Sequence, residues 1–451
     1  MGEIQKETKM SCEADRQPLK KAAARTKTRW AMLSLIMVVM CVNYLDRGNL
    51  AVSAPVMQKE LGINSAQMGL LFSAFAWSYA FIIPFAGALL DKIGPKIMFT
   101  IGIVGWSLFT CLMGLANSLT TIVGCRLGVG AFEAPTIPTN VRCVTAWFPE
   151  DERALAVGLY TSMQYVALGF LTPALTWLLL HWGWRSIFYL SGGVGLVVGL
   201  VWYFFYDDPR DSKRVSQAEL DYIEQGGALI YAGNKATKQP FSWGIVRQLF
   251  RERQLVGMFI GHFSIMTTLF FFMTWFPSYL ITAKGLTLLK TGFYAMIPFL
   301  VAICGALLGG RWSDWLLLHG KSKSVARKLP IVLGFLLAMV ILGANYTDDI
   351  NWVIFFMAIA FFGQAMSSTV TGALLADIAP IEAIGLSGGL LNFIANIGSA
   401  LSPIVIGCIV QYTGSFNWAL GYVAAVAAVG LGAYLFVIGD VYRIQLAKES
   451  N

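Results

Sequence analysis

The chain has 451 residues, 57% of them hydrophobic and only 13% charged. A soluble protein of this length carries about a quarter charged residues, so the composition and the mean hydropathy of +0.64 exclude a soluble protein and predict a polytopic membrane protein. The net charge of +8 does not indicate nucleic-acid binding, because eight of the 33 Lys and Arg lie in residues 1–29 and eight in residues 207–254, outside the apolar runs. Basic clusters in such places are typical of the cytoplasmic segments of a membrane protein.

Twelve apolar runs are long enough to cross a bilayer as helices, for which roughly 20 residues are needed. No cleavable signal peptide is expected, since the basic segment 1–29 leads directly into the first run. Because twelve is an even number, we expect both termini on one side, and the basic clusters predict that this side is the cytoplasm. The runs cover residues 30–55, 66–90, 97–116, 119–141, 154–180, 186–206, 255–282, 289–312, 329–346, 352–376, 383–411 and 416–438.

The longest polar stretch inside the chain separates the first six runs from the last six. Within it, Ser216 and Glu219 have the spacing of a capping box that opens a short helix, and Gly226 and Gly227 are placed to close that helix. We interpret this stretch as a cytoplasmic linker with no chemistry of its own. The predicted organisation is a basic cytoplasmic tail, a first six-helix bundle, a linker with a short helix, a second six-helix bundle and a cytoplasmic tail, at residues 1–29, 30–206, 207–254, 255–438 and 439–451.

Two adjacent charges, Asp46 and Arg47, lie near the middle of the first apolar run. A charge at this depth costs about 2.5–3.5 kcal/mol even on the lenient insertion scale, so charges there are rare and face a partner or a wet cavity. Either the two residues form a structural pair that pins two helices, or they belong to the binding and proton-handling centre of a transporter.

A spacing of four residues between Gly and Asp occurs once in each half. It joins Gly87 to Asp91 at the end of the second run, and Gly310 to Asp314 at the end of the eighth run, six runs later. Transporters are commonly built from repeated halves around a midplane site. The sequence therefore predicts an all-α membrane protein with two pseudo-symmetric six-helix bundles.

The fourth run adds Arg126 and Glu133, which are seven residues apart and share one face of a helix. With Asp46 and Arg47 they place two cations and two carboxylates at membrane depth in the first half. One interpretation is a purely structural cluster of four charges. Against it, buried charges without a further task are replaceable by apolar packing at little loss, whereas a cluster that exchanges partners with an anion or a proton has a function.

Neutral polar residues interrupt other runs: Tyr79 in the second, Gln164 in the fifth, and Asn392 and Asn396 on one face of the eleventh. Such residues either hold helices together or bind the hydroxyl groups of a ligand. In the seventh run, His262 is either a third proton site or a neutral, hydrogen-bonded histidine.

The segment Gly87–Lys96 is similar to the signature G-x-L-x-D-R/K-x-G-x-R/K that the major facilitator superfamily carries between its second and third helices. More narrowly, the chain resembles the anion:cation symporter family, whose bacterial members include proton-coupled permeases for galactonate, glucarate and hexuronates. The stretches that carry this second resemblance are Asn43–Arg47, Phe72–Tyr79, Arg126–Pro135 and Ala146–Arg153.

The resemblance implies the major facilitator fold and assigns roles to individual residues. It implies that Arg47 grips a substrate carboxylate and that Asp46 and Glu133 carry protons, while Arg126 either neutralises Glu133 or helps to hold the anion. Residues 367–372 in the tenth run depart from the pattern, because they lack the aromatic side chain expected to face a sugar acid. The positions that match sugar-acid contacts are Tyr44, Tyr79, Gln164 and Asn392, and the expected gating residues are Asp91, Lys92 and Asp314.

These features predict a proton-coupled symporter that imports an organic anion by alternating access. The resemblance favours a sugar acid such as a hexonate, an aldarate or a hexuronate, and the alternative is a non-sugar carboxylate such as phthalate or tartrate. A receptor or scaffold that transports nothing leaves the midplane charges unexplained. We expect no enzyme, cofactor or metal, since the chain has only three His, no Gly-x-Ser-x-Gly, no Gly-rich phosphate loop and no paired cysteine spacing.

The expected partners are a small organic anion, protons and the lipid bilayer, without nucleic acid, and the protein is expected to act as a monomer. The loop between the first two runs has only about ten residues, whereas eukaryotic members of the resembled family tend to have a longer one. This favours a multi-pass protein of the bacterial inner (plasma) membrane with both termini in the cytoplasm.

Overall fold

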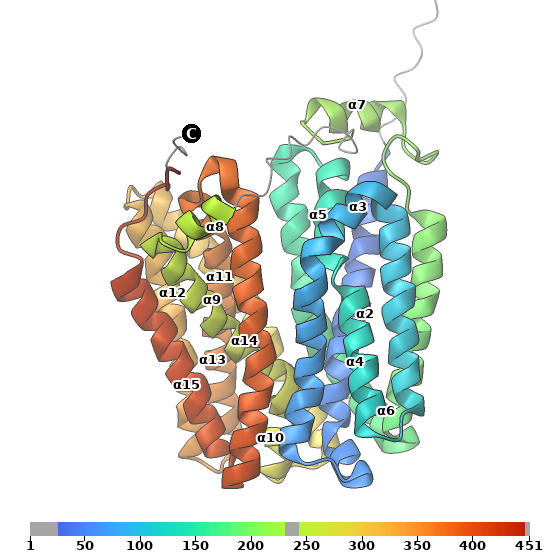
Figure 1. Ribbon diagram of the computed structural model, residues 1–451, viewed down its shortest axis with the longest axis vertical. Helices are drawn as coiled ribbons and strands as arrows, with labels where there is room; N and C mark the ends of the chain where they lie inside the picture. Colours follow the sequence, from blue (N-terminus) through green and yellow to red (C-terminus); the bar gives the residue numbers. More distant parts are fainter. Residues whose placement is uncertain (1–25, 231–242, 447–451) are drawn as a thin grey trace, which may run out of the picture.

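A computed structural model describes residues 26–230 and 243–446, and every regular element in these ranges is a helix (Figure 1). Expectations for residues 1–25, 231–242 and 447–451 lie outside the described residues. The first half of the fold comprises α2 to α6, with bounds Thr28–Leu61, Ser65–Leu115, Leu119–Glu133, Thr136–Trp147 and Glu150–Phe205.

Two short helices follow the first half, α7 (Gln217–Gln225) and α8 (Trp243–Leu249). The second half contains η1 and η4 as π-helical turns and η2 and η3 as 3₁₀ turns. The elements of the second half, in chain order, are α9 (Arg253–Phe270), η1 (Phe271–Trp275), α10 (Phe276–Thr282), α11 (Leu288–Leu318), α12 (Lys323–Met339), η2 (Val340–Asn345), α13 (Ile350–Ile378), η3 (Ile381–Ala383), α14 (Ile384–Thr413), α15 (Phe416–Gly432) and η4 (Ala433–Val437).

The described chain crosses the membrane twelve times. Ten of its helical segments are long and apolar enough to span a bilayer. One of them, α6, has 56 residues. As one straight helix it would be about 84 Å long at 1.5 Å per residue, far more than the roughly 30 Å of a hydrocarbon core, and it makes two passes instead. The helices α4 and α5 together make one more. The predicted fold of twelve spanning helices is confirmed.

Two of the long helices are broken at a glycine between their two passes. In α3 the break is at Gly94, whose φ of 78° lies in the left-handed region that only glycine adopts without strain. Gly183 makes the matching break in α6, with φ 75°. Gly94 is the second glycine of the motif Gly87–Lys96. The turn between the two spans requires a glycine at this position.

The fourth crossing is interrupted at Glu133, one of the two predicted proton carriers. Glu133 is the last residue of α4, and α5 begins after Ala134 and Pro135. Proline has no N–H to donate and its ring clashes with the preceding turn of a helix. The sequence therefore ends α4 at the carboxylate, in the interior of the first half.

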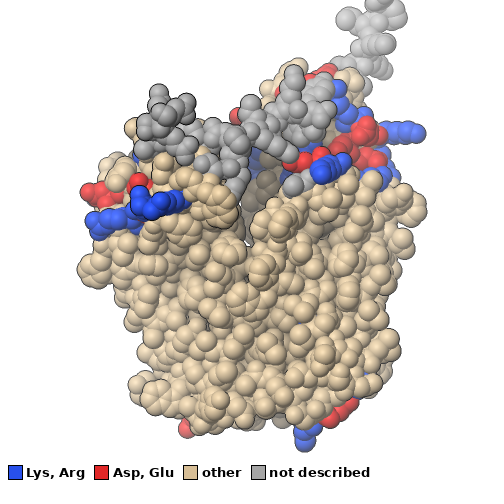
Figure 2. Space-filling model, viewed as in Figure 1, with Lys and Arg blue, Asp and Glu red and all other residues tan. Residues whose placement is uncertain are grey.

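The two halves lie side by side and contact each other near one end. We call the end that carries α7 and α8 the linker end, and the opposite one the far end (Figure 1). Ser73 Oγ donates to the carbonyl of Ala400 at 2.6 Å, joining α3 to α14. The rings of Tyr165 and Phe361, in α6 and α13, are 6.0 Å apart. The surface is hollowed between the halves at the linker end and closed at the far end (Figure 2).

The linker helix α7 is attached to the first half through the beginning of α2. Ser216 caps α7 by accepting from the N–H of Glu219, but Glu219 does not complete a capping box, because the Ser216 N–H donates to Thr26 instead. The Glu219 carboxylate accepts from the backbone N–H groups of Thr28 and Arg29 at 2.9 and 3.2 Å. The first N–H groups of a helix lack intrahelical partners, so Glu219 caps α2 from a distant part of the chain.

An ion-pair network strengthens this attachment. Arg29 donates from Nη1 to Glu219 at 3.1 Å and from Nε to Glu152 at 2.8 Å, and the Glu219 side chain is fully buried. Burial alone raises the pKa of Glu219, but hydrogen bonds from Thr26, Thr28 and Arg29 outweigh it and hold this pKa below its ordinary value. The linker is therefore fastened to the helix that carries Asp46 and Arg47.

Glu219→Gln is expected to destabilise the protein by about 3 kcal/mol, because removing one member of a buried pair leaves the other uncompensated. Thermal unfolding in detergent measures the loss. Glu224→Gln on the same helix is the matched control. Its partner Arg210 is 3.5 Å away and both side chains are more than 40% exposed, so the control is expected to change stability by less than about 1 kcal/mol. Equal losses in both variants would contradict the capping role.

Acid provides a second test of the same contact. Because the native pKa of Glu219 lies below its unfolded value, its stabilising contribution is complete above the unfolded pKa and is lost as pH falls through the native pKa. Glu219→Gln has no such contribution to lose. The difference in melting temperature between parent and variant is therefore expected to shrink as the pH falls from 7 towards 3.

The last described residues of the chain close the second half in a similar way. The amide of Gln254, at the start of α9, donates to the Tyr442 carbonyl at 3.2 Å and accepts from the Tyr442 N–H at 3.3 Å. Ile444 is buried and its N–H donates to the carbonyl of Ile378, at the end of α13. Each half is thus fastened at the linker end by chain that follows its sixth crossing.

Candidate functional site

Arg47 and Glu133 form an ion pair between α2 and α4. Nε of Arg47 donates to Oε2 of Glu133 at 2.9 Å, and the exposed fractions of the two side chains are 13% and 0%. Arg47 pairs with Glu133 rather than with its neighbour Asp46. A guanidinium has five N–H donors, and the bond to Glu133 uses the one on Nε, so the fork of two Nη groups is not used in this pair.

Three aromatic rings surround the Arg47 guanidinium. Its central carbon lies 4.9 Å from the ring centre of Tyr44, 4.8 Å from Phe75 and 5.4 Å from Tyr79. Tyr44 is three residues before Arg47 on α2, and the other two rings are four residues apart on α3, so each helix presents its rings on one face. Rings at this distance attract a cation and fix the plane of the guanidinium.

Arg126 also lies over one of these rings. Its central guanidinium carbon is 5.2 Å from the ring centre of Phe75, so Phe75 is shared by both arginines. Arg126 is 3% exposed, makes no salt bridge within 4.0 Å among the described residues, and its buried Nε has no hydrogen-bond partner there. A buried cation without a direct partner is costly, which makes Arg126 available to a charge that arrives later.

Asp46 points to a different side of α2 from Arg47, since consecutive helical residues project about 100° apart. Its Oδ1 accepts from the Asn49 amide at 3.5 Å, and the same amide donates to Ser191 Oγ in α6 at 3.2 Å. Asp46 is fully buried, and its Oδ2 has no hydrogen-bond partner among the described residues. The two carboxylates therefore have separate surroundings within the first half.

The sequence profile of the Major Facilitator Superfamily matches residues 36–360, more than two thirds of the chain. The chain belongs to the Major Facilitator Superfamily. Among similar proteins, the D-galactonate transporter of Escherichia coli is 44% identical over 94% of this chain and 98% of its own length. A probable galactarate/D-glucarate transporter of Bacillus subtilis is 39% identical over 95% and 96%.

Solved structures show the same fold. A bacterial homologue of the human lysosomal transporter Spinster, in an inward-facing and occupied conformation, matches with a TM-score of 0.66 and 18% sequence identity over 92% of this chain and 95% of its own. Among the described residues, no three His, Cys, Asp or Glu side chains are grouped to hold a metal ion. The protein is a transporter and not an enzyme, because the family and the similar proteins are transporters.

The gating residues expected from the superfamily signature lie at the linker end. Asp91 and Lys92 follow the second crossing, just before the Gly94 break. In the second half, Asp314 accepts from Arg327 at 3.0 Å. The same arginine binds Asp377 at 2.8 Å, so these charges join α11, α12 and α13 at that end.

Among the described residues, no hydrogen bond joins Gln164, Asn392 or Asn396 to the charged cluster. Gln164 lies half-buried in α6. Asn392 and Asn396 donate to carbonyls one turn earlier in their own helix, those of Gly388 and Asn392, so neither bridges two helices. His262 differs from the expectation of a hydrogen-bonded ring, since its Nδ1 is buried without a partner among the described residues.

Helix packing accounts for part of the departure of residues 367–372 from the family pattern. Ser367 donates to the Ile331 carbonyl at 3.1 Å, and Thr371 contacts the Tyr434 hydroxyl at 3.1 Å. Both side chains are fully buried. These hydroxyl groups hold α13 against α12 and the turn η4, so this part of the departure concerns helix packing in the second half.

Sequence reasoning missed three residues that shape the cluster: Phe75, Asn49 and Ser191. Phe75 precedes Tyr79 by one helical turn, and that spacing was the available signal. Asn49 follows Asp46 by three residues and is likewise on its face. Ser191 lies 142 residues away from Asn49 along the chain, and no periodicity within one helix relates the two.

Proposed function

We propose that this chain is a proton-coupled symporter that imports an organic anion, a sugar acid, by alternating access. The observation that carries the proposal is the buried Arg47–Glu133 pair, ringed by aromatic side chains. The two Nη groups of Arg47 form a planar fork that matches a carboxylate, the group that all sugar acids share. A site for an anion is supported by this fork, which the bond to Glu133 does not use.

Coupling between proton and substrate follows because Glu133 and the substrate carboxylate compete for Arg47. While Glu133 is ionised, it holds the guanidinium at 2.9 Å. A proton on Glu133 cancels its charge, weakens this bond and releases Arg47 for the substrate carboxylate. Burial makes the exchange energetically significant, because charges interact more strongly away from water. Glu133 therefore binds one proton for each substrate anion.

Asp46 is proposed as the second proton carrier. Its buried Oδ2 has no partner among the described residues, so a proton there disturbs no existing bond. Arg126, without a salt bridge in the described chain, is placed to balance whichever carboxylate is charged. Two protons and one monoanion give a cycle that moves one net positive charge.

We infer that the linker end faces the cytoplasm. Lys and Arg gather at the linker end of the molecule and are few at the far end (Figure 2). Basic loops are retained in the cytoplasm. In this orientation the protein is an inner-membrane permease with both termini inside, and the surface hollowed at the linker end corresponds to release of substrate into the cell. One chain supplies every proposed site residue, which supports a monomeric transporter.

Sugar acids are favoured by the polar groups near the anchor and by the similar proteins. The hydroxyl groups of Tyr44 and Tyr79 belong to rings that contact Arg47. Gln164 and Asn392 offer amides, which both donate and accept, as a polyol requires, and we assign them to the substrate at another stage of the cycle. The names of the similar proteins, galactonate and galactarate/glucarate transporters, support this class.

Uptake into proteoliposomes tests this proposal. A panel of labelled galactonate, glucarate, a hexuronate, tartrate and phthalate is offered with and without an inward proton gradient. With the membrane potential held at zero, we expect the sugar acids to accumulate only with the gradient. Accumulation of phthalate or tartrate in preference to all three sugar acids would move the assignment to a non-sugar carboxylate. Accumulation with neither a proton gradient nor a membrane potential would overturn proton coupling.

Asp91→Asn is expected to lower the transport rate about tenfold while leaving substrate affinity within a factor of two. The reason is that we assign Asp91 to gating at the linker end, away from Arg47. Initial uptake rates and equilibrium binding measure the two effects separately. Asp221→Asn, an exposed acid on α7, is the control and should transport like the parent. A large loss of affinity in Asp91→Asn with a normal rate would contradict the gating assignment.

A further inference from the structure

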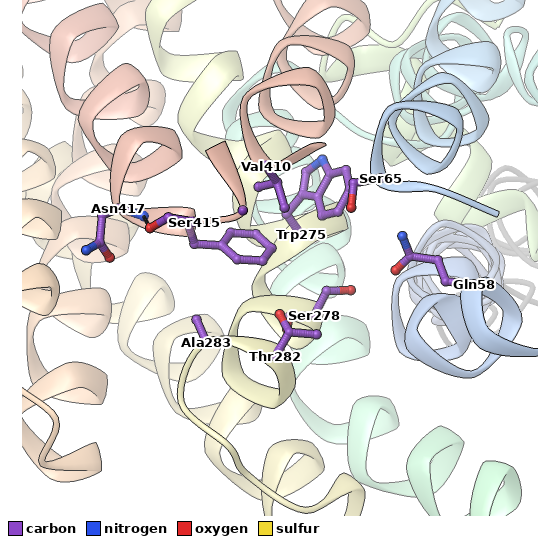
Figure 3. A pocket seen from close by; sticks show the side chains of 11 residues that line it. Gln58, Ser65, Trp275, Ser278, Thr282, Ala283, Val410, Ser415 and Asn417 are labelled. Carbon is purple, nitrogen blue, oxygen red and sulfur yellow. Dashed lines mark hydrogen bonds between the residues drawn. The ribbon is translucent and has the colours of Figure 1, made fainter. Parts of the chain in front are cut away.

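A pocket at the far end lies where the two halves meet, apart from the charged cluster. Its volume is about 400 Å³, and it is lined by residues of η1 and α10 and by the far ends of α2, α3, α14 and α15 (Figure 3). Gln58 and Ser65 line it from the first half. Ligand sites of small molecules commonly have volumes of about 300–1,000 Å³. The pocket is large enough for one molecule of the size of a sugar.

Most of the pocket's polar lining groups are hydroxyls and amides, and none of the described lining side chains is charged. From the second half, Ser278, Thr282 and Asn417 contribute, and no Lys, Arg, Asp or Glu is among the described lining residues. Hydroxyl and amide groups both donate and accept, as the hydroxyl groups of a ligand require. A carboxylate in this pocket would have no lining cation, so the composition favours a neutral compound rich in hydroxyl groups.

One lining hydroxyl has no bond to the described protein. Ser278 is 2% exposed, and its Oγ has no hydrogen-bond partner among the described residues. Figure 3 shows its oxygen directed into the space between Ser65, Gln58 and Trp275. A buried hydroxyl without a partner costs about 1–3 kcal/mol, and a ligand hydroxyl removes that cost. The indole of Trp275 and the ring of Phe416 provide an apolar floor, 5.9 Å apart between ring centres.

We propose that this pocket binds a neutral polyhydroxylated molecule and that the bound molecule holds the far ends of the two halves together. The lining groups come from both halves and are assembled in the conformation that is closed at the far end. Opening of the far end separates Gln58 and Ser65 from Ser278 and Asn417. A ligand that binds only one conformation increases the population of that conformation, so occupation is expected to oppose uptake from the far side.

The binding test uses galactitol, a neutral hexitol, and the thermal stability of the purified protein. Galactitol is expected to raise the melting temperature of the parent with a saturable concentration dependence. Ala283→Trp fills the pocket and should abolish the saturable part. Leu289→Trp, an exposed far-end position, is the matched control and should respond like the parent. An identical response in Ala283→Trp would show a general solvent effect and overturn the site.

Ser278→Ala tests the unbonded hydroxyl without adding bulk. It is expected to weaken the apparent affinity for galactitol about fivefold, the equivalent of one neutral hydrogen bond. Unchanged affinity would contradict the role of Ser278. Galactonate is the second probe. Stabilisation by galactonate that Ala283→Trp abolishes would overturn the neutral ligand class.

The functional test adds galactitol outside proteoliposomes whose far end faces outward. At a concentration equal to its dissociation constant, galactitol is expected to slow uptake about twofold in the parent and in Leu289→Trp, because half of the closed conformation is then occupied. No slowing in the parent would overturn the link to conformation. Arg47→Lys should keep the thermal response to galactitol, so the outcome for this pocket is separable from the outcome for the proposed sugar-acid site.

Discussion

Arg47→Lys is expected to weaken substrate binding about 30- to 100-fold, although the positive charge is retained. The planar fork of arginine makes two parallel bonds to a carboxylate, whereas an ammonium group acts as a point charge. Losing a charge-assisted hydrogen bond costs about 1.5–3 kcal/mol, and each 1.4 kcal/mol is a factor of ten. The three rings around Arg47 increase the effect, since they hold a flat group in a defined plane. Equilibrium binding of labelled galactonate to the purified protein measures it.

Arg185→Lys is the matched control. Arg185 binds Glu60 at the far end, within the first half, and is outside every proposed substrate contact. We expect this variant to bind like the parent. If Arg47→Lys also binds like the parent, the carboxylate anchor is elsewhere and the proposed site is misplaced.

Glu133→Gln is expected to abolish the response of uptake to membrane voltage while leaving exchange of labelled for unlabelled substrate intact. With two protons and a monoanion, each cycle moves one charge, which a membrane potential drives by about 2.3 kcal/mol per 100 mV. A glutamine resembles the protonated carboxyl group, so Arg47 stays free for substrate. Exchange needs the occupied carrier to reorient but does not need a net release of protons. Uptake at equal pH on both sides, with an imposed potassium-diffusion potential, measures the voltage response.

Glu60→Gln provides the comparison for this experiment, because Glu60 bonds Arg185 and Trp184 at the far end and carries no proposed proton. It should keep the parent's voltage response. Voltage-driven accumulation of a monoanion by Glu133→Gln at the parent's rate would remove Glu133 from the proton pathway. A dianionic substrate makes the two-proton cycle electroneutral, so the same measurement on glucarate should show no voltage response in the parent.

The fold was predictable because hydrophobic length is a strong signal in membrane proteins. Runs of the required length and a polar linker determine the twelve crossings almost without regard to tertiary contacts. The breaks followed local rules as well: glycine at Gly94, where φ is positive, and proline after Glu133. The role of Glu219 was not predictable, because its bonds to Thr28 and Arg29 join residues about 190 positions apart.

The candidate site was predictable in its residue types and only partly in its pairing. The resemblance and the helical spacing pointed to Arg47 and Glu133, and the structure brings these two together. Adjacent positions suggested that Asp46 and Arg47 act as one pair, but consecutive helical residues point in different directions. Asp46 faces Asn49 and the sixth crossing instead. Which face of a helix meets which neighbour depends on packing between helices, and no pattern within one helix contains that information.

The contacts that hold each half together at the linker end do not depend on an uncut linker. The first half is secured by contacts that end before residue 231, and Gln254 and Tyr442 secure the second half within residues 243–446. A cut between residues 230 and 243 therefore removes none of these contacts. Two separately encoded fragments would each keep the contacts that fasten their half, and they should associate in a membrane through the far-end interface. Reconstitution from two polypeptides would then allow one half to be labelled at a time.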